Sequence, residues 1–461
     1  MSPKDRQAIV VCGLGFGDEC KGSITDYLAR KHKAHAVVRY NGGAQAAHNV
    51  VLSNDKHHTF SQFGSATFVP GVQTFLSHFM LINPIGMIRE EEALRKQGVR
   101  DAFERTTVDG RALVITPFHT AVNRLRELSR GDNRRGSCGQ GVGETVQDAK
   151  LNSRLAIRVT DLWNWPLLKL KLEHLQESAL EKVRGFADRI PDNESAKREL
   201  LILNSDKTVQ NCMSWYIEFS ELGQVVPDDH IKHILHRQGT VIFEGAQGAL
   251  LDEFHGFYPH VTWTNTTTSN AHALICEGNY NGKVTSYGLV RAYATRHGCG
   301  PFVTEDRVLT QRLTDEHNGM NEWQRDFRVG WFDLVAARYA IEVAGNIKKL
   351  VVSCLDQFVQ VPQTKVCVAY TLRKFAGAQD FFSNVSESHG KIRIGKVKRT
   401  CLGMVHQEKL TKILGGCQPE YQTLPSCAPS DYVRFLHDQL GIPVTLVSTG
   451  PTEKDKMSMR L

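Results

Sequence analysis

The sequence predicts an α/β fold with a mostly parallel central sheet and flanking helices. Short β-branched runs that are apolar on both faces alternate with helical patterns along most of the chain, as expected when parallel strands are buried. A glycine-rich segment, Gly13–Ser23, joins the first of these runs to the first helical pattern. Such a strand-to-helix turn exposes backbone N–H groups at the positive end of a helix, which together suit a phosphate.

The individual elements follow from the same patterns. The expected strands, in chain order, are Ala8–Cys12, Ala36–Tyr40, Leu113–Thr116, Thr240–Phe243, Lys283–Val290, Leu350–Ser353 and Pro443–Val447. The helical patterns between them include Ser23–Lys33, Thr120–Ser129 and Phe332–Ala344.

Two segments depart from this alternation. Residues 160–238 are rich in Leu, Glu and Lys at helical spacing, so we expect a helical excursion from the sheet. Residues 364–436, with Lys365–Leu372 as a strand, are expected to form a C-terminal subdomain insertion. Because no repeat, low-complexity tract or Pro/Ser linker separates these segments, residues 1–461 are predicted to form one unit.

Composition excludes several classes of protein. No apolar run is long enough to cross a bilayer and no signal peptide is visible, so we expect a cytoplasmic protein without membrane contact. Eleven scattered cysteines without a Cys-x-x-Cys pair favour reduced thiols over a disulfide framework or a zinc ribbon. The net charge of +7 is mild, and without a Lys/Arg run we expect no nucleic-acid partner.

The glycine-rich segment carries residues suited to phosphate chemistry. Lys21 can place a positive charge on phosphate oxygens, and Asp18 can hold a magnesium ion or act as a base. The spacing matches neither the Walker A motif nor the dinucleotide-binding fingerprint. By pattern alone, a tight structural turn remains the alternative.

Two further glycine-bearing segments follow predicted strands. Arg39–His48 follows the second strand, and parallel strands would bring His48 and Asp18 to the same sheet edge, ready for proton transfer. Phe243–Asp252 follows another strand, and Gln247 in it can pair with a carbonyl and a ring nitrogen together. The alternatives are a structural histidine and a plain strand-end turn.

Taken together, the motifs resemble those of the adenylosuccinate synthetase family. The family signature Gly-Asp-Glu-Gly-Lys-Gly-Lys is similar to Gly17-Asp-Glu-Cys-Lys-Gly-Ser23, and a second signature ending in Gly-His is similar to Gly43-Ala-Gln-Ala-Ala-His48. The segments Glu244–Asp252, Arg291–Glu305 and Ser448–Pro451 also match. The motifs keep their order from residue 8 to about residue 455, so the resemblance covers nearly the whole chain and implies a P-loop-NTPase-like fold.

The resemblance implies a function: a ligase that joins aspartate to C6 of IMP, with GTP hydrolysis through a 6-phosphoryl intermediate. In this interpretation Asp18 is the base, His48 stabilises the transferred phosphoryl group and Gln247 orients the purine. Mg²⁺ would bind Asp18 and the carbonyl of Ala47. The residues that bind the triphosphate would be Gly17, Glu19, Lys21 and Gly22. Those that bind the acceptor nucleotide would be Gln45, Cys138, Arg154, Thr262 and Arg325, and those that bind the donor base would be Asp356, Ser448, Gly450 and Pro451. The amino acid would be bound by Arg325 and Arg328. The family's phosphate-binding arginine comes from the partner subunit, so Arg154 implies a homodimer.

The chain also departs from the family pattern at positions that set specificity. Cys138 replaces a hydroxyl donor, His297 replaces a valine, Cys354 replaces the lysine of the guanine-binding Thr-Lys-x-Asp segment, and Phe327 replaces an arginine. Two alternatives therefore stay open: a paralogue that uses a 2-amino-6-oxopurine nucleotide (GMP or dGMP) or takes ATP as donor, and a catalytically silent nucleotide-binding regulator. The retained Asp18, Lys21, His48 and Gln247 favour an enzyme.

Overall fold

A computed structural model describes residues 6–313, 322–324, 326–358, 363–424 and 428–459. Its centre is a ten-stranded sheet in which neighbouring strands are parallel, apart from the antiparallel pair at one edge. In spatial order the strands are β21 (Lys456–Ser458), β20 (Val444–Ser448), β15 (Lys349–Ser353), β11 (Lys283–Arg291), β1 (Arg6–Gly13), β10 (Gly239–Glu244), β2 (Ala36–Arg39), β5 (Gln73–Leu76), β7 (Thr106–Asp109) and β9 (Gln224–Val226). The predicted α/β class with a mostly parallel sheet is confirmed.

Strand β1 shows why the apolar runs form this sheet. It lies in the middle, with β10 and β11 as its parallel neighbours, and its residues 8–13 are buried. Ala8 and Val10 pack with helices α8 (His230–His236) and α9 (Ser269–Glu277) on one face. Ile9 and Val11 pack with helix α1 (Lys21–His32) on the other face. Helices therefore cover both faces, which explains why β1 lacks an apolar–polar alternation.

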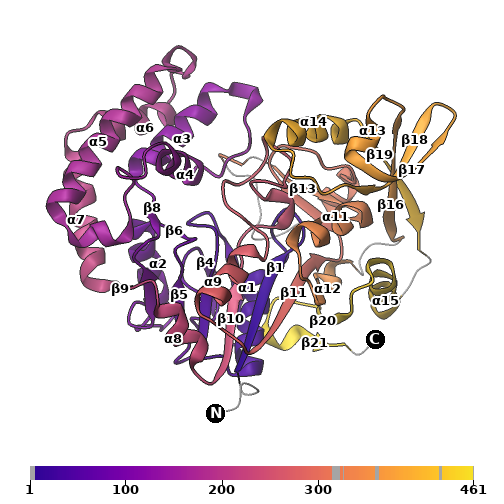
Figure 1. Ribbon diagram of the computed structural model, residues 1–461, viewed down its shortest axis with the longest axis horizontal. Helices are drawn as coiled ribbons and strands as arrows, with labels where there is room; N and C mark the ends of the chain where they lie inside the picture. The colour runs from indigo at the N-terminus through magenta and orange to yellow at the C-terminus, as the bar shows by residue number, and fades with distance from the viewer. Residues whose placement is uncertain (1–5, 314–321, 325, 359–362, 425–427, 460–461) are drawn as a thin grey trace.

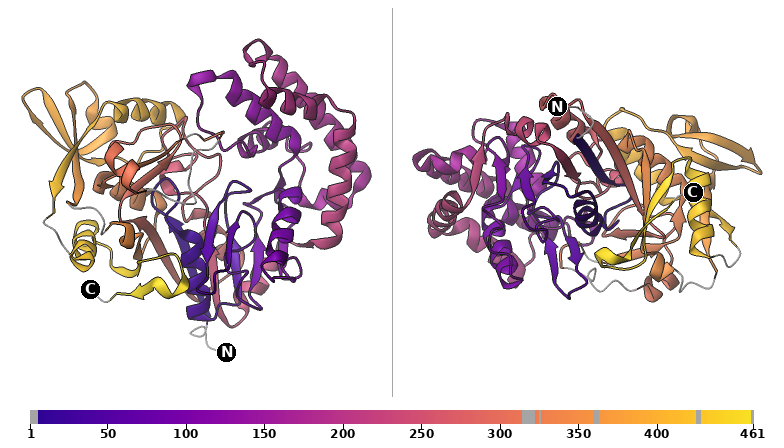
Figure 2. Two further views of the ribbon diagram at one scale, coloured as in Figure 1. Left: turned by 180° about the vertical axis from the view of Figure 1, so that it is seen from behind. Right: turned by 90° about the horizontal axis from the view of Figure 1, so that it is seen from below.

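Helices form one end of the molecule (Figure 1). Figure 2 shows the same helical end from behind, on the side of the sheet opposite the C-terminus. The helices of this half are α2 (Pro84–Lys96), α3 (Pro117–Ser129), α4 (Val142–Leu151), α5 (Trp165–Arg184), α6 (Glu194–Asn204) and α7 (Lys207–Leu222). They share a core to which α2, α3, α5 and α7 contribute buried side chains such as Met87, Leu125, Leu172 and Phe219.

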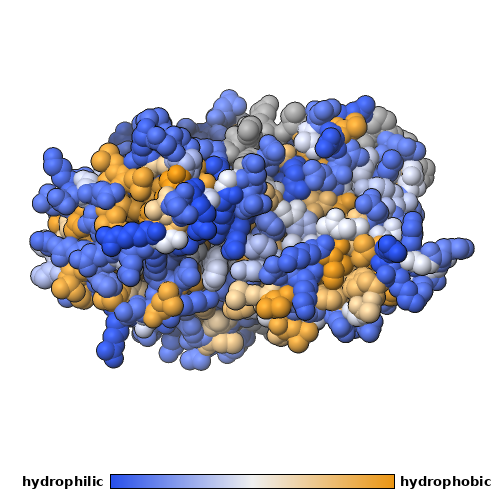
Figure 3. Space-filling model, turned by 90° about the horizontal axis from the view of Figure 1, so that it is seen from above, coloured by the Kyte–Doolittle hydropathy of each residue, from blue (hydrophilic) through white to orange (hydrophobic). Residues whose placement is uncertain are grey.

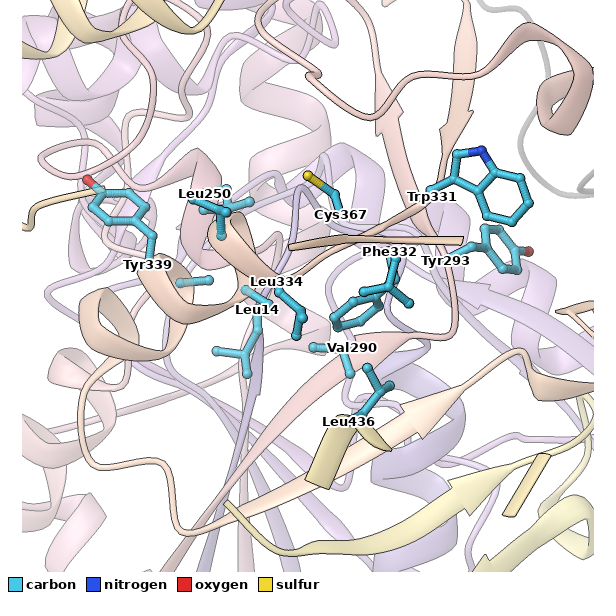
Figure 4. Close-up of a cluster of buried hydrophobic side chains, with 14 of the residues drawn as sticks. Leu14, Leu250, Val290, Tyr293, Trp331, Phe332, Leu334, Tyr339, Cys367 and Leu436 are labelled. Atoms are coloured by element: carbon cyan, nitrogen blue, oxygen red, sulfur yellow. The ribbon is translucent and has the colours of Figure 1, made fainter. Parts of the chain in front are cut away.

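A second, smaller sheet lies at the opposite end. It contains β14 (Phe332–Asp333), β16 (Lys365–Arg373), β18 (Lys391–Val397), β17 (Phe382–Ser388) and β19 (Gln418–Thr423). Helices α11 (Leu334–Ala344) and α14 (Met404–Gly415) contribute to its core. Figure 4 shows that this core reaches the central sheet, because Val290 of β11 lies beside Phe332 of β14 and Leu334 of α11.

Short elements complete the described chain. Three two-stranded sheets pair β12 (Ala294–His297) with β13 (Phe327–Gly330), β3 (His48–Val51) with β4 (His57–Phe60), and β6 (Leu81–Ile82) with β8 (Leu113–Val114). The remaining α-helices are α10 (Arg307–Arg312), α12 (Leu355–Phe358), α13 (Ala378–Phe381) and α15 (Pro429–Leu440). The 3-10 turns are η2 (Gly131–Asn133), η3 (Val159–Trp163), η4 (Ala187–Arg189), η5 (Ala249–Leu251) and η6 (Glu453–Asp455).

One expected strand differs from the prediction. Leu113–Thr116 was expected to be a strand of the sheet, but only Leu113–Val114 is extended, and it pairs with β6 outside the central sheet. Thr116 instead caps helix α3, because its hydroxyl accepts the backbone N–H of His119 and Pro117 follows it. The division into a helical excursion at 160–238 and an insertion at 364–436 stays a prediction.

The surface is mixed in character. In the face shown in Figure 3, hydrophilic residues predominate around smaller apolar patches. Among the described residues, no helix is both long and apolar enough to cross a membrane.

Candidate active site

A cavity of about 1070 Å³ lies along the carboxyl-terminal ends of the central strands. One side of it comes from the segments that follow β1, β2, β10, β11, β15 and β20, which is where open parallel sheets bind ligands. Helices α3 and α4 and the loop between them also contribute lining residues. The basic side chains that line it are Lys21, Arg126, Arg130, Arg135, Arg291 and Arg296, and the acidic ones are Asp18, Glu127, Glu144 and Asp356. The excess of cations suits a polyanionic ligand.

The turn between β1 and α1 forms an anion cradle. The Glu19 carboxylate accepts the backbone N–H groups of Gly15 and Gly17, each at 2.9 Å, and pairs with Lys21 Nζ at 2.6 Å. Both charged side chains are buried. A Cβ at Gly13 would lie 2.3 Å from Glu19 Oε2, so only glycine leaves room for this carboxylate. The N–H groups of this turn therefore hold an anionic group, here the chain's own Glu19 carboxylate, and their binding of a phosphate stays a prediction.

Asp18 faces the cavity from the same turn. Its backbone is in the left-handed region with φ of 63°, an unusual conformation for a residue with a Cβ. His297 of β12 lies beside it, with Nε2 3.7 Å from Asp18 Oδ2. The structure thus places His297 beside Asp18, the predicted base, a contact that the sequence did not suggest.

His48 begins β3, beside the start of α1, and is held by a buried carboxylate. Its Nδ1 lies 2.6 Å from Glu244 Oε1, and the other oxygen of Glu244 accepts the backbone N–H of Ser65 at 3.0 Å. Gly22 lets α1 approach this imidazole, because a Cβ there would lie 2.9 Å from the Cβ of His48. The Nε2 atom of His48 is buried and has no hydrogen-bond partner among the described residues.

Burial and charge set the protonation of this pair. Burial lowers the pKa of His48 to about 4, although Glu244 opposes the shift. Burial alone would raise the pKa of Glu244, but the charge of Arg39 and the hydrogen bonds from His48 and Ser65 lower it. Near neutral pH the imidazole is therefore neutral, with its proton on Nδ1, and the carboxylate is ionised. His48 lines the cavity, where an anion that approaches Nε2 would favour its protonation.

Two amide side chains complete the centre of the cavity. Gln45 precedes β3 and Gln247 follows β10, and both line the cavity. The oxygen and nitrogen of each amide are buried without a hydrogen-bond partner in the described part of the chain. Buried amides are normally satisfied, so these two groups indicate a polar ligand with both donors and acceptors.

The predicted acceptor-phosphate residues separate into two groups. Cys138 and Thr262 line the cavity, as predicted for residues near a phosphate. The loop before Cys138 is fixed by Glu127, whose carboxylate accepts the N–H groups of Arg135 and Gly136. Arg154, by contrast, is exposed beyond α4 and is not a lining residue of this chain's cavity.

At the other end of the cavity lie the residues predicted to bind the donor base. Asp356 is exposed to the cavity after β15, and Ser448, Gly450 and Pro451 follow β20. The Ser448 hydroxyl donates to the carbonyl of Gly450 at 3.0 Å. This end is therefore built from the two strands that the sequence assigned to it.

The predicted amino-acid residues are less clearly placed. Arg325 lies outside the described residues. The Arg328 guanidinium pairs with Glu305 at 2.8 Å and donates to the carbonyls of Gly298 and Gly300, so its charge is held within the loop here. Burial lowers the pKa of the neighbouring Arg296, a lining residue, to about 9. Arg296 was not among the predicted site residues.

Sequence reasoning also missed the role of Glu244. The available signal was a carboxylate at the end of an apolar strand, where an unpaired charge would be costly to bury. Glu244 sits within a motif that the sequence had marked, but its partners His48 and Ser65 lie 196 and 179 residues away in the chain.

The fold and the cavity define an α/β enzyme that acts on phosphorylated substrates. An anion cradle, an oriented imidazole and unpartnered amides converge at the ends of parallel strands. More specifically, the chain belongs to the adenylosuccinate synthetase family of C–N-forming ligases, because the family model described as adenylosuccinate synthetase matches residues 10–457.

Individual relatives agree with this assignment over the full length. The chain is 31% identical to adenylosuccinate synthetase of Chlorobium limicola over 461 residues, covering 98% of each chain. It is 32% identical to that of Synechocystis sp. over 456 residues, covering 96% of this chain and 93% of the relative.

Two solved structures share the fold. A fully ligated adenylosuccinate synthetase from Plasmodium falciparum superposes with a TM-score of 0.75 at 20% identity, covering 98% of this chain and 99% of that one. Succinoaminodeoxyadenylate synthetase of cyanophage S-2L, bound to dGMP and dATP, gives a TM-score of 0.56 at 14% identity, covering 99% and 97%.

Proposed function

We propose that the protein joins aspartate to C6 of IMP with hydrolysis of GTP, forming adenylosuccinate. The observation that carries the proposal is the convergence in one cavity of Asp18, the His48–Glu244 pair and the two unpartnered amides. Family membership supplies the reaction, and full-length relatives at 30–32% identity carry this name.

Each residue has a part that fits its surroundings. Asp18 removes the N1 proton of the purine, which makes the 6-oxygen nucleophilic. Gln247 and Gln45 donate and accept hydrogen bonds along the purine and its sugar, which satisfies their buried amides. His48 Nε2 meets the negative charge that develops during phosphoryl transfer, and Glu244 holds the imidazole in place and stabilises its protonated form.

The phosphate chain of GTP belongs in the turn between β1 and α1. Its oxygens would replace the Glu19 carboxylate on the N–H groups of Gly15 and Gly17, and Lys21 would pair with them. The guanine would lie toward Asp356, whose carboxylate can accept two N–H groups of that base.

Magnesium fits this site. Asp18 and Ala47 both line the cavity, and a carboxylate and a carbonyl oxygen are the hard ligands that Mg²⁺ prefers. No cluster of three or more His, Cys, Asp or Glu side chains suited to a metal occurs among the described residues, so phosphate oxygens would complete its coordination. Bound there, Mg²⁺ would neutralise phosphate charge during transfer.

A homodimer is part of the proposal. Arg154 is exposed and does not line the cavity of its own chain, as expected if it serves the acceptor phosphate of a second subunit. Cys138 and Thr262, which line the cavity, would be the part of that phosphate subsite supplied by the other chain.

The reaction can be tested directly. Purified protein is incubated with IMP, aspartate, GTP and Mg²⁺, and adenylosuccinate is followed by its ultraviolet absorbance while phosphate is measured separately. We expect equal amounts of the two products, none without any one substrate, and a loss of at least about 100-fold in Asp18→Asn. Phosphate release without adenylosuccinate, or formation only with GMP, dGMP or another amino acid, would contradict the assignment. Binding without turnover would favour the silent regulator.

A further inference from the structure

Two cysteine thiols meet at the donor end of the cavity. Cys20 Sγ lies 3.6 Å from Cys354 Sγ, although the residues are 334 positions apart in the chain. Cys20 precedes helix α1 in the anion cradle, and Cys354 lies between β15 and Asp356. Both are partly exposed and line the cavity, so a small oxidant can reach them.

Neither thiol belongs to the family pattern. The signatures that the chain resembles have glycine at the position of Cys20 and lysine at the position of Cys354. Both cysteines adopt the left-handed backbone conformation, with φ of 65° and 58°, which disfavours any residue with a Cβ. At Cys20 the chain therefore carries a thiol where this backbone conformation favours glycine.

The geometry allows either sulfur to react first. Both cysteines line the same cavity and their sulfurs are in contact, so whichever thiolate attacks a disulfide in solution has the other cysteine beside it to resolve the mixed disulfide.

We propose that Cys20 and Cys354 form a reversible disulfide that switches off binding of the donor nucleotide. In the first step the thiolate of one of the two cysteines attacks a low-molecular-weight disulfide such as glutathione disulfide, giving a mixed disulfide and one small thiolate. The other cysteine then loses its proton and attacks the protein sulfur of the mixed disulfide, and the second small thiol leaves. The protein dithiol loses two electrons and two protons, and the small disulfide is reduced to two thiols.

The geometry requires only a local movement. The sulfur atoms must approach from 3.6 Å to about 2.0 Å. Their backbones are already neighbours, because the hydroxyl of Ser353 donates to the carbonyl of Glu19 at 3.4 Å. The cross-link would covalently join the turn after β1 to the end of β15.

The expected consequence concerns Glu19. Its carboxylate holds the N–H groups of Gly15 and Gly17 that a triphosphate would need, and it is adjacent to Cys20. A disulfide at Cys20 would fix the turn in this conformation and hinder the exit of Glu19. This effect on affinity depends on the proposed triphosphate site, whereas formation of the disulfide does not.

Disulfide formation is tested on the full-length protein treated with glutathione disulfide, alkylated, digested and mapped by mass spectrometry. We expect a linked peptide containing Cys20 and Cys354 that dithiothreitol removes. Cys354→Ser and Cys20→Ser should each stop at glutathione bound to the remaining cysteine. Cys299→Ser, which alters another partly exposed cavity cysteine, should form the linked peptide as wild type does. Absence of that peptide, or a different pairing, would overturn the proposal.

The switch is tested by calorimetric titration with Mg²⁺ and GTP. Oxidised wild type should bind GTP at least about tenfold more weakly than reduced protein, which is about 1.4 kcal/mol. Dithiothreitol should restore the affinity, and oxidation of the double variant Cys20→Ser/Cys354→Ser should change it less than twofold. Equal affinity in a fully cross-linked sample would refute the switch, whereas no binding in the reduced protein would instead refute the proposed donor.

Discussion

Glu244→Gln is the sharpest test of the His48 arrangement. The substitution keeps the shape of the side chain but removes its charge. The amide oxygen can still accept from His48 Nδ1, the atom that lies 2.6 Å from Glu244 Oε1. In the wild type the backbone N–H of Ser65 donates to the other carboxylate oxygen at 3.0 Å. In the variant the amide nitrogen would occupy that position, so two hydrogen-bond donors would face each other.

The size of the effect follows from these contacts. A hydrogen bond to a charged group contributes about 1.5–3 kcal/mol, and the protonated imidazole loses this support when Glu244 becomes neutral. Because about 1.4 kcal/mol corresponds to a tenfold change in rate, kcat should fall about 10- to 100-fold. The unsatisfied N–H of Ser65 should also lower the free energy of unfolding by about 1–3 kcal/mol.

The assay separates turnover from folding. We expect a reduced kcat for adenylosuccinate formation while KM for IMP and GTP changes less than about threefold. Glu90→Gln is the matched control, because buried Glu90 similarly accepts the N–H groups of Ser61 and Gln62, each at 2.9 Å, but belongs to α2. The control should lose stability and keep its turnover. A kcat for Glu244→Gln within twofold of wild type would show that the carboxylate does not support His48.

Three other predictions concern pH, assembly and the donor. Burial lowers the pKa of His48 in the folded protein to about 4, whereas an imidazole in the unfolded chain takes up a proton below about pH 6.5. The free energy of unfolding should therefore decrease as the pH is lowered from about 6.5 towards 4. Urea denaturation should show that His48→Gln removes about 2 kcal/mol of the stability difference between pH 7 and pH 5, and an unchanged difference would assign it to other histidines. Inactive Asp18→Ala and Arg154→Ala proteins should regain part of the activity after verified subunit exchange, and no recovery would contradict a shared site. GTP should give a higher kcat/KM than ATP because Asp356 would face an adenine ring nitrogen without a hydrogen, at a cost of about 1–3 kcal/mol; equal values would mean that Asp356 does not read the base.

The sequence predicted the parts of the fold that depend on local composition. Strand β1 and its turn into α1 were predictable because an apolar run and a glycine-rich segment determine them without distant partners. Leu113–Thr116 was partly wrong because the β-branched run contains Thr116, which caps a helix instead of extending a strand. Composition does not distinguish these two uses of threonine when proline follows.

The sequence predicted those residues of the candidate site that belong to motifs at the ends of strands. Asp18, His48 and Gln247 each follow or begin such an element, and the parallel sheet brings them to one cavity. The pairing of Cys20 with Cys354 was not predictable, because it depends on the neighbouring positions of the turn after β1 and the end of β15. The placement of Arg154 requires a second subunit, and its role stays a prediction.

The position of β1 in the sheet has a consequence for folding during synthesis. Its parallel partners are β10 and β11, which begin only at residues 239 and 283, so both edges of β1 stay unpaired while more than half of the chain is made. Pairings so distant in sequence form slowly, and an apolar strand with open edges invites association with other chains. The donor end of the cavity closes later still, when β20 joins β15. We therefore expect the nascent protein to depend on chaperones that shield β1, and to bind nucleotide only after its last parallel strand has been added.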